Sequence, residues 1–151
     1  MPSGCPPFAP RRTATAPIPS ADHRGTSRHE PPFRLVDLPV ADLDRAIAFY
    51  AAVLGSAVTK EGGPGFSFGL LAHSGNEVAG CLVASEGGNA PSPGGPLVYL
   101  NAEGRIAEAV AAATAHGGRI LEAVVPIGPH GFRAIVLDSE GNRIALHSPT
   151  A

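Results

Sequence analysis

The sequence has few cysteines, few charged residues and no long apolar run, and each of these absences excludes a class of protein. Cys5 and Cys81 are the only cysteines, so neither a disulfide framework nor a zinc ribbon can form. No run of about 18 apolar residues is present to cross a bilayer. The net charge of −2 provides no basic field for holding nucleic acid. We therefore expect a cytoplasmic protein with neither a membrane nor a nucleic acid as its partner.

The apolar content is high enough for one folded domain. Hydrophobic residues make up 44% of the 151 residues and charged residues only 16%, which is typical of a chain that builds a core. The length allows one domain of ordinary size and excludes two large ones. The sequence therefore predicts a single globular domain.

The first 32 residues differ in composition from the rest. Residues 1–32 hold eight of the 16 prolines and four arginines, with almost no large apolar side chain. Such a stretch cannot bury a core, so we expect a disordered Pro/Arg-rich tail. Arg11 and Arg12 allow a targeting signal as an alternative, although no apolar stretch follows the pair. The folded domain is expected over residues 33–151.

Two halves with the same order of elements follow the tail. In residues 33–86 the pattern predicts a strand, a helix that begins after Asp42 and ends at Gly55, and three strands. Leu43, Ile47, Tyr50 and Leu54 are expected to form the buried face of this helix. A Gly/Pro linker at 87–95 leads to residues 95–149, where strand, helix and three strands recur. Each half is therefore a βαβββ module.

The repeat is also visible residue by residue. GFSFGLLAHSGNEVA, from Gly65, matches GFRAIVLDSEGNRIA, from Gly131, at the Gly-Phe pair, the Gly-Asn turn and the final alanine. Gly and Asn tolerate the positive φ of tight turns, so two unrelated hairpins remain an alternative. The equal order of elements favours an internal duplication.

Two phrases resemble the vicinal oxygen chelate (VOC) superfamily of glyoxalase, bleomycin resistance and dioxygenase-like domains. They are DLPVADLDRAIAFYAAVLG, from Asp37, and LDSEGNRIALHSP, from Leu137. The resemblance implies an α+β fold in which two tandem βαβββ modules form curved mixed sheets around a cleft. It also implies that metal-dependent members place one ligand on each of four strands at the cleft floor.

This chain lacks donors at the positions that correspond to the family's metal ligands. Counting from the helix starts and the Gly-Asn turns gives Leu35, Ala79, Leu97 and Ala145, none of which can bind a divalent ion. We therefore expect no metal and no other cofactor. A divalent metal held by displaced ligands stays open, because His130 and His147 are expected near the cleft.

Strand alternation predicts which side chains face the cleft. Asp37 and His147 are the candidates for a catalytic acid and base, and the set able to hold a ligand is Leu35, Asp37, Leu97, Tyr99, Asn101, Arg143 and His147. Alternatively, Asp37 and Arg143 form a structural ion pair and Tyr99 merely packs.

Two functions of different classes agree with these features. The first is a VOC-family protein that binds a small organic molecule in its cleft without metal, as bleomycin resistance members do by sequestration. The alternative is a glyoxalase-like lyase or isomerase, either metal-free or metal-dependent through displaced ligands. A scaffold role is a third reading. In either functional case the exposed strand edges favour a homodimer.

Overall fold

The computed structural model describes residues 33–75 and 77–151. The described residues belong to one compact unit. The expected tail at 1–32 lies outside the described residues. Within the described residues no helix is long and apolar enough to span a membrane.

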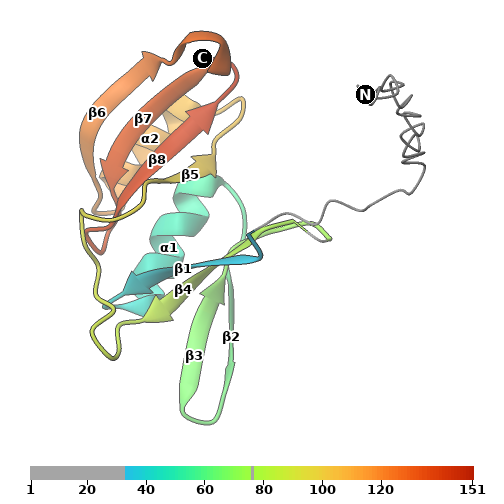
Figure 1. The fold of residues 1–151 in the computed structure, drawn as a ribbon, viewed down its shortest axis with the longest axis vertical. Helices are drawn as coiled ribbons and strands as arrows, with labels where there is room; N and C mark the ends of the chain where they lie inside the picture. The colour runs from blue at the N-terminus through green and yellow to red at the C-terminus, as the bar shows by residue number, and fades with distance from the viewer. Residues whose placement is uncertain (1–32, 76) are drawn as a thin grey trace, which may run out of the picture. The chain divides into compact units, whose positions relative to one another are not determined.

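The first half has the predicted βαβββ order (Figure 1). Its four strands form one mixed sheet in the order β1-β4-β3-β2, in which β1 runs parallel to β4 and the other pairs are antiparallel. The elements are β1 (Leu35–Val40), α1 (Leu43–Leu54), β2 (Thr59–Gly63), β3 (Phe66–Leu70) and β4 (Ala79–Ala84).

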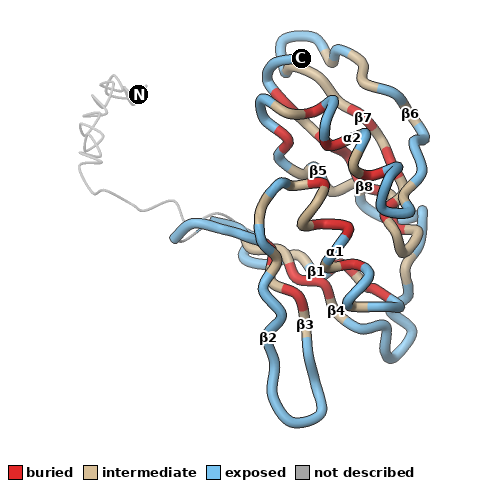
Figure 2. Tube along the Cα trace, turned by 180° about the vertical axis from the view of Figure 1, so that it is seen from behind, coloured by how far each residue is buried: buried red, intermediate tan, exposed pale blue. Residues whose placement is uncertain are grey.

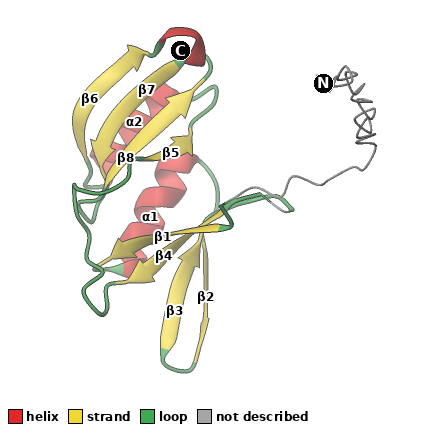
Figure 3. Cartoon of the chain, in the orientation of Figure 1, coloured by secondary structure: helices red, strands yellow, loops and turns green. Residues whose placement is uncertain are grey.

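The second half repeats this topology, with a sheet in the order β5-β8-β7-β6. The strand β5 is parallel to β8, as β1 is to β4. One helix covers one face of each sheet, which leaves the other face open (Figure 3). The elements are β5 (Val98–Asn101), α2 (Ile106–Ala115), β6 (Arg119–Pro126), the short 3-10 helix η1 (Gly128–His130), β7 (Phe132–Leu137) and β8 (Arg143–Ser148). The prediction of two tandem modules with curved mixed sheets is confirmed.

The helix α1 begins and ends at the predicted residues. The side chain of Asp42 accepts a hydrogen bond of 3.0 Å from the backbone N–H of Arg45, which is the contact of an N-cap. Gly55 ends the helix with φ of 64°, a left-handed conformation that glycine adopts without steric cost. These two residues fix the length of α1.

The buried face of α1 differs from the predicted one. Ala46, Phe49, Tyr50 and Val53 are fully buried, whereas Leu43, Ile47 and Leu54 are only partly buried against the core. The reason is that α1 packs against α2 as well as against its own sheet. One core therefore takes side chains from both helices and both sheets.

A tight turn of the second half holds the start of the first half's helix. The Glu140 side chain accepts hydrogen bonds of 3.0 Å from the backbone N–H groups of Ala41 and Asp42, and it forms an ion pair with Arg45 at 2.7 Å. Asn142 donates to the carbonyl of Pro39 at 2.8 Å. We call these contacts the hairpin latch, because they join the β7–β8 turn to the β1–α1 connection.

Tyr50 extends the latch into the core. Its hydroxyl donates a hydrogen bond of 2.6 Å to the carboxylate of Asp138, and both residues are buried. Burial raises the pKa of Tyr50 well above its usual value, and the charge of Asp138 raises it further. The phenol therefore stays protonated and acts as a donor.

The two hairpins matched in the sequence do not have the same turn. The strands β7 and β8 are joined by residues 138–142, whereas β3 ends at Leu70 and β4 begins only at Ala79. Asp138 accepts hydrogen bonds of 2.8 Å from the backbone N–H groups of Glu140 and Asn142. The corresponding position is Ala72, which has no acceptor to tighten a turn.

Candidate functional site

The strand β1 divides its side chains between the core and the open face of the sheet. Leu38 and Val40 are buried, whereas Leu35 and Asp37 are exposed. Along the first-half hairpin, β2 is exposed throughout (Figure 2). The open face of this sheet therefore leaves side chains accessible to a ligand.

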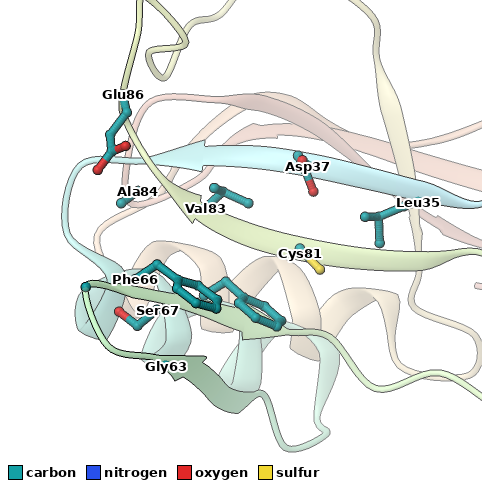
Figure 4. Close-up of a pocket in the computed structure, with 11 residues that line it drawn as sticks. Leu35, Asp37, Gly63, Phe66, Ser67, Cys81, Val83, Ala84 and Glu86 are labelled. Atoms are coloured by element: carbon teal, nitrogen blue, oxygen red, sulfur yellow. The ribbon is translucent and has the colours of Figure 1, made fainter.

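An apolar hollow of about 650 Å³ lies on the open face of the first-half sheet. Phe66 and Phe68 form one wall, with parallel rings whose centroids are 6.5 Å apart. Figure 4 shows Leu35, Asp37, Cys81 and Val83 on β1 and β4, with Phe66 on the neighbouring β3. We call this space the aromatic hollow.

Sequence reasoning missed the two phenylalanines. The signal was their spacing, because residues two apart in a strand lie on the same face. Burial raises the pKa of the Cys81 thiol in the same hollow. A protonated thiol is a poor nucleophile, so this residue contributes apolar surface.

A second space of about 910 Å³ lies between the two halves, and we call it the groove. Of the predicted ligand-binding residues, Leu35, Asp37, Tyr99 and Arg143 all line it. The linker forms another wall, which is tied to the latch by the 3.1 Å hydrogen bond from the N–H of Ser92 to Asn142. Leu35 and Asp37 line both the groove and the aromatic hollow, so the two spaces share the β1 face.

Asp37 and Arg143 do not form an ion pair with each other. Within the part of the chain that the structure describes, Asp37 has no ion pair or hydrogen bond from its side chain. The Nη2 of Arg143 reaches only the carbonyl of Gly95, at 3.4 Å, and its buried Nε has no hydrogen-bond partner. The alternative of a structural ion pair is therefore wrong, and two opposite unpaired charges line one groove.

Polar side chains cover the open face of the second-half sheet. Arg133 forms an ion pair of 2.8 Å with Glu122 and donates a hydrogen bond of 3.1 Å to the hydroxyl of Tyr99. The hydrogen bonds with Tyr99 and Glu122 raise the pKa of Arg133. Sequence reasoning missed Arg133, although its register position opposite His147 follows from the hairpin. Tyr99 thus has a polar contact as well as packing surface.

The ring of His147 is held in one orientation. Its Nε2 lies 2.6 Å from the carbonyl of His130, so it must carry the hydrogen and donate. When the ring is neutral, Nδ1 is left as an acceptor. The ring lies edge-on to Tyr99, with centroids 6.3 Å apart. His147 can therefore act as a base on this face.

The remaining predicted residues lie beside this face. Asn101 stands opposite His147 in the β5–β8 pair, and its side-chain oxygen accepts a hydrogen bond of 2.9 Å from the N–H of Glu103. Leu97 comes directly before β5 and is partly buried. Neither residue shares the aromatic hollow with Asp37.

The pairing of the strands and the count along the sequence disagree on one of the four positions that correspond to the family's metal ligands. Leu35 stands opposite Ala79 in the β1–β4 pair, and Tyr99 stands opposite Ala145 in the β5–β8 pair. The position equivalent to Leu35 is therefore Tyr99, two residues after Leu97. The count differs because the connection from β5 to α2 has another length than the connection from β1 to α1.

The residues at these positions do not fit a divalent ion. Leu35, Ala79 and Ala145 have no donor atoms, and the Tyr99 hydroxyl is bonded to a cation, Arg133. In residues 33–75 and 77–151 no group of three or more His, Cys, Asp or Glu side chains could hold a metal. The family's metal ion therefore has no set of ligands at these positions.

The paired modules define the class of fold, and comparison with known proteins gives the family. A model described as Glyoxalase/Bleomycin resistance protein/Dioxygenase superfamily matches residues 33–146. The chain belongs to this superfamily, which confirms the resemblance to VOC proteins. Among curated protein sequences, none matches the chain.

Several solved structures share the fold. A glyoxalase/bleomycin resistance protein from Albidiferax ferrireducens is 22% identical with a TM-score of 0.58, and the match covers 77% of this chain and 98% of that one. A fosfomycin resistance protein from Listeria monocytogenes is 17% identical with a TM-score of 0.57, covering 77% and 91%. A glyoxalase I variant from Zea mays is 26% identical with a TM-score of 0.59, covering 77% and 46%.

Proposed function

We propose that the chain is a metal-free binding protein that holds a small organic molecule in the aromatic hollow and the groove. One observation supports this proposal above all. Three of the positions that correspond to the family's metal ligands lack donor atoms, whereas the side chains around them suit an organic molecule. Leu35, Ala79 and Ala145 offer no donors, while stacked phenylalanine rings and unpaired charges border the same face. A concave, mostly apolar site with a few polar groups is typical of small-molecule binding.

The ligand contacts are assigned to the residues expected from the sequence, together with the phenylalanines. The residues that line these two spaces are Leu35, Asp37, Tyr99, Arg143, Phe66 and Phe68. The other expected residues, Leu97, Asn101 and His147, line neither space, and we propose them as contacts only for a ligand that extends beyond the groove. One of the similar structures is named a glyoxalase/bleomycin resistance protein, and sequestration of a small molecule is the biological role that we propose. The free thiol of Cys81 agrees with a reducing cytoplasm.

Nile red, a neutral apolar dye, tests the aromatic hollow directly. Its fluorescence should rise on binding the parent protein, and Phe68→Ala should weaken binding by about tenfold because a stacked wall is lost. Ile120→Ala on β6 removes a partly exposed side chain outside the hollow and serves as the control. Equal binding by the parent and both variants would contradict the proposal.

Metal content separates this proposal from a metal enzyme. Protein purified without chelator should contain much less than one equivalent of zinc, nickel, manganese or iron, and its melting temperature should not rise with any of them. Stoichiometric metal would instead favour displaced ligands. In that case His130→Ala and His147→Ala should abolish metal binding.

A metal-free lyase or isomerase is the second candidate function. The orientation of His147 favours it, because a fixed tautomer with a free Nδ1 is what a general base requires. Asp37 lines the aromatic hollow and the groove, whereas His147 contacts Tyr99 and His130. Proton exchange into methylglyoxal hemithioacetal, followed by NMR in D₂O, should occur at the uncatalysed rate if the chain only binds.

A further inference from the structure

Asp37 and Arg143 place one unpaired negative and one unpaired positive charge on the same groove. Glu86 lines the aromatic hollow but not the groove. Two nearby arginines are already paired. Arg45 has Glu140, and Arg133 has Glu122. Asp37 and Arg143 are therefore charges that a ligand can still satisfy.

The chemistry of each group selects its ligand partner. The guanidinium of Arg143 makes one long hydrogen bond, to Gly95 at 3.4 Å, so most of its donors are free for another acceptor. A carboxylate matches this fork with two oxygens. The ionised carboxylate of Asp37 can only accept hydrogen bonds, and an ammonium group is its natural partner.

The apolar surface between the charges selects the rest of the ligand. Leu35 lies beside Asp37 on β1, and both also line the hollow with the stacked rings of Phe66 and Phe68. A ligand with its charged ends in the groove can extend an apolar or aromatic part over this wall. Aromatic rings gain from such offset or stacked contacts.

We infer that the ligand is a zwitterion with an apolar or aromatic side group, such as an aromatic amino acid or a short peptide. Its ammonium group contacts Asp37 and its carboxylate contacts Arg143, while its side group occupies the aromatic hollow. This inference rests on the proposed function, because it specifies the ligand class of the same site.

Matched probes test the inference by removing one charge at a time. The probes are L-phenylalanine and L-phenylalanylglycine, whose charges stand at different separations. Each is compared with its carboxamide, which lacks the carboxylate, and its N-acetyl derivative, which lacks the ammonium group. In calorimetric titrations of the full chain, the better zwitterion should bind about tenfold more tightly than either derivative.

Two variants assign each charge to its residue. Asp37→Asn should remove the advantage of the zwitterion over the N-acetyl derivative and leave its advantage over the amide. Arg143→Gln should do the reverse. Glu103→Gln and Arg119→Gln change the same charges at exposed positions outside both spaces and should leave all affinities unchanged.

The outcomes separate this inference from the proposed function. If probes of all charge types displace Nile red equally, the inference is overturned and the binding function stands. If neither Nile red nor any probe binds, both are overturned. Zwitterion preference that survives Asp37→Asn and Arg143→Gln would also overturn the assignment, since other residues would then recognise the charges.

Discussion

The hydroxyl of Tyr50 in α1 and the carboxylate of Asp138 in the β7–β8 turn are joined by a buried hydrogen bond of 2.6 Å. The two residues come from different halves and are 88 positions apart. Together with Glu140 and Asn142, this contact ties the closing turn of one module to the first helix of the other. The latch holds the β1–α1 connection next to the strand that carries Asp37.

Removing the Tyr50 hydroxyl should destabilise the domain. Tyr50→Phe leaves a buried carboxylate short of one donor, and we expect a loss of about 1–3 kcal/mol in the free energy of unfolding, measured with urea. Tyr99→Phe is the matched control because that ring is 47% exposed, and it should cost less than about 1 kcal/mol. Equal losses in the two variants would show that the latch contributes little.

Glu140 should make stability depend on acid pH. Although burial raises the pKa of Glu140, the hydrogen bonds from Arg45, Asp42, Ser139 and Ala41 outweigh this effect and lower the pKa to about 2. The folded-state pKa therefore lies below the usual 4.5 of an unfolded glutamate. The stabilisation is complete above pH 4.5 and is lost as the pH falls towards 2.

The variant Glu140→Gln tests this pH dependence. Its free energy of unfolding should be lower than that of the parent at neutral pH, by up to about 3 kcal/mol, and the difference should shrink between pH 4.5 and 2. Glu77→Gln is the control, since Glu77 accepts one exposed hydrogen bond, from the N–H of Ser74. A constant difference across the pH range would contradict the role of the Glu140 charge.

Metal-binding side chains placed at two of the positions that correspond to the family's metal ligands should create a metal site. Leu35 and Ala79 are opposite each other on β1 and β4, so Leu35→His with Ala79→Glu brings two donors side by side. We expect zinc or nickel to stabilise this double variant, by about 2.7 kcal/mol when the ion is at a hundred times its Kd. The parent and both single variants should show no comparable shift in Tm. A parent that responds to micromolar zinc would indicate a metal site elsewhere.

Removing residues 1–32 should leave the melting temperature within a few degrees. The buried core of the described residues is built from Val36 onwards, so the deletion removes none of its members. Differential scanning calorimetry of the full chain and of residues 33–151 makes the comparison. A fall of more than about 10 °C would show that the tail contributes to the fold.

We expect the chain to be a homodimer in solution. Phe66 is 64% exposed, and β1, β2, β5 and β6 are edge strands of their sheets. Such surfaces are commonly covered by a second copy. Light scattering at micromolar concentration should give twice the 15.3 kDa mass of one chain. A particle of 15.3 kDa would contradict the expected dimer.

Local signals made the fold predictable from the sequence. Asp42 and Gly55 mark the ends of α1, and strand alternation separates Leu38 from Asp37 without any information on distant contacts. The buried face of α1 was not predictable in the same way. It depends on α2, and no pattern within residues 43–54 records where a second helix packs.

The polar part of the site escaped prediction for a similar reason. No local pattern marks Arg133, because its contacts with Tyr99 and Glu122 form only when the strands pair in the sheet. Asp37 and Arg143 are likewise unpaired because the fold keeps the two side chains apart, and the sequence alone does not give that separation. By contrast, the apolar residues at three family ligand positions were readable directly, because the Gly-Asn turns and the helix start provide fixed points for counting.

Within residues 33–75 and 77–151, only the second half contributes a hairpin latch, and this gives the two hairpins unequal tolerance of insertions. An insertion between β7 and β8 would displace Asp138, Glu140 and Asn142 together and release α1 of the other half. The connection between β3 and β4 bears no such contacts to α2 at the corresponding Ala72 and Ser74. The β7–β8 turn should therefore tolerate an inserted residue less well than the connection between β3 and β4.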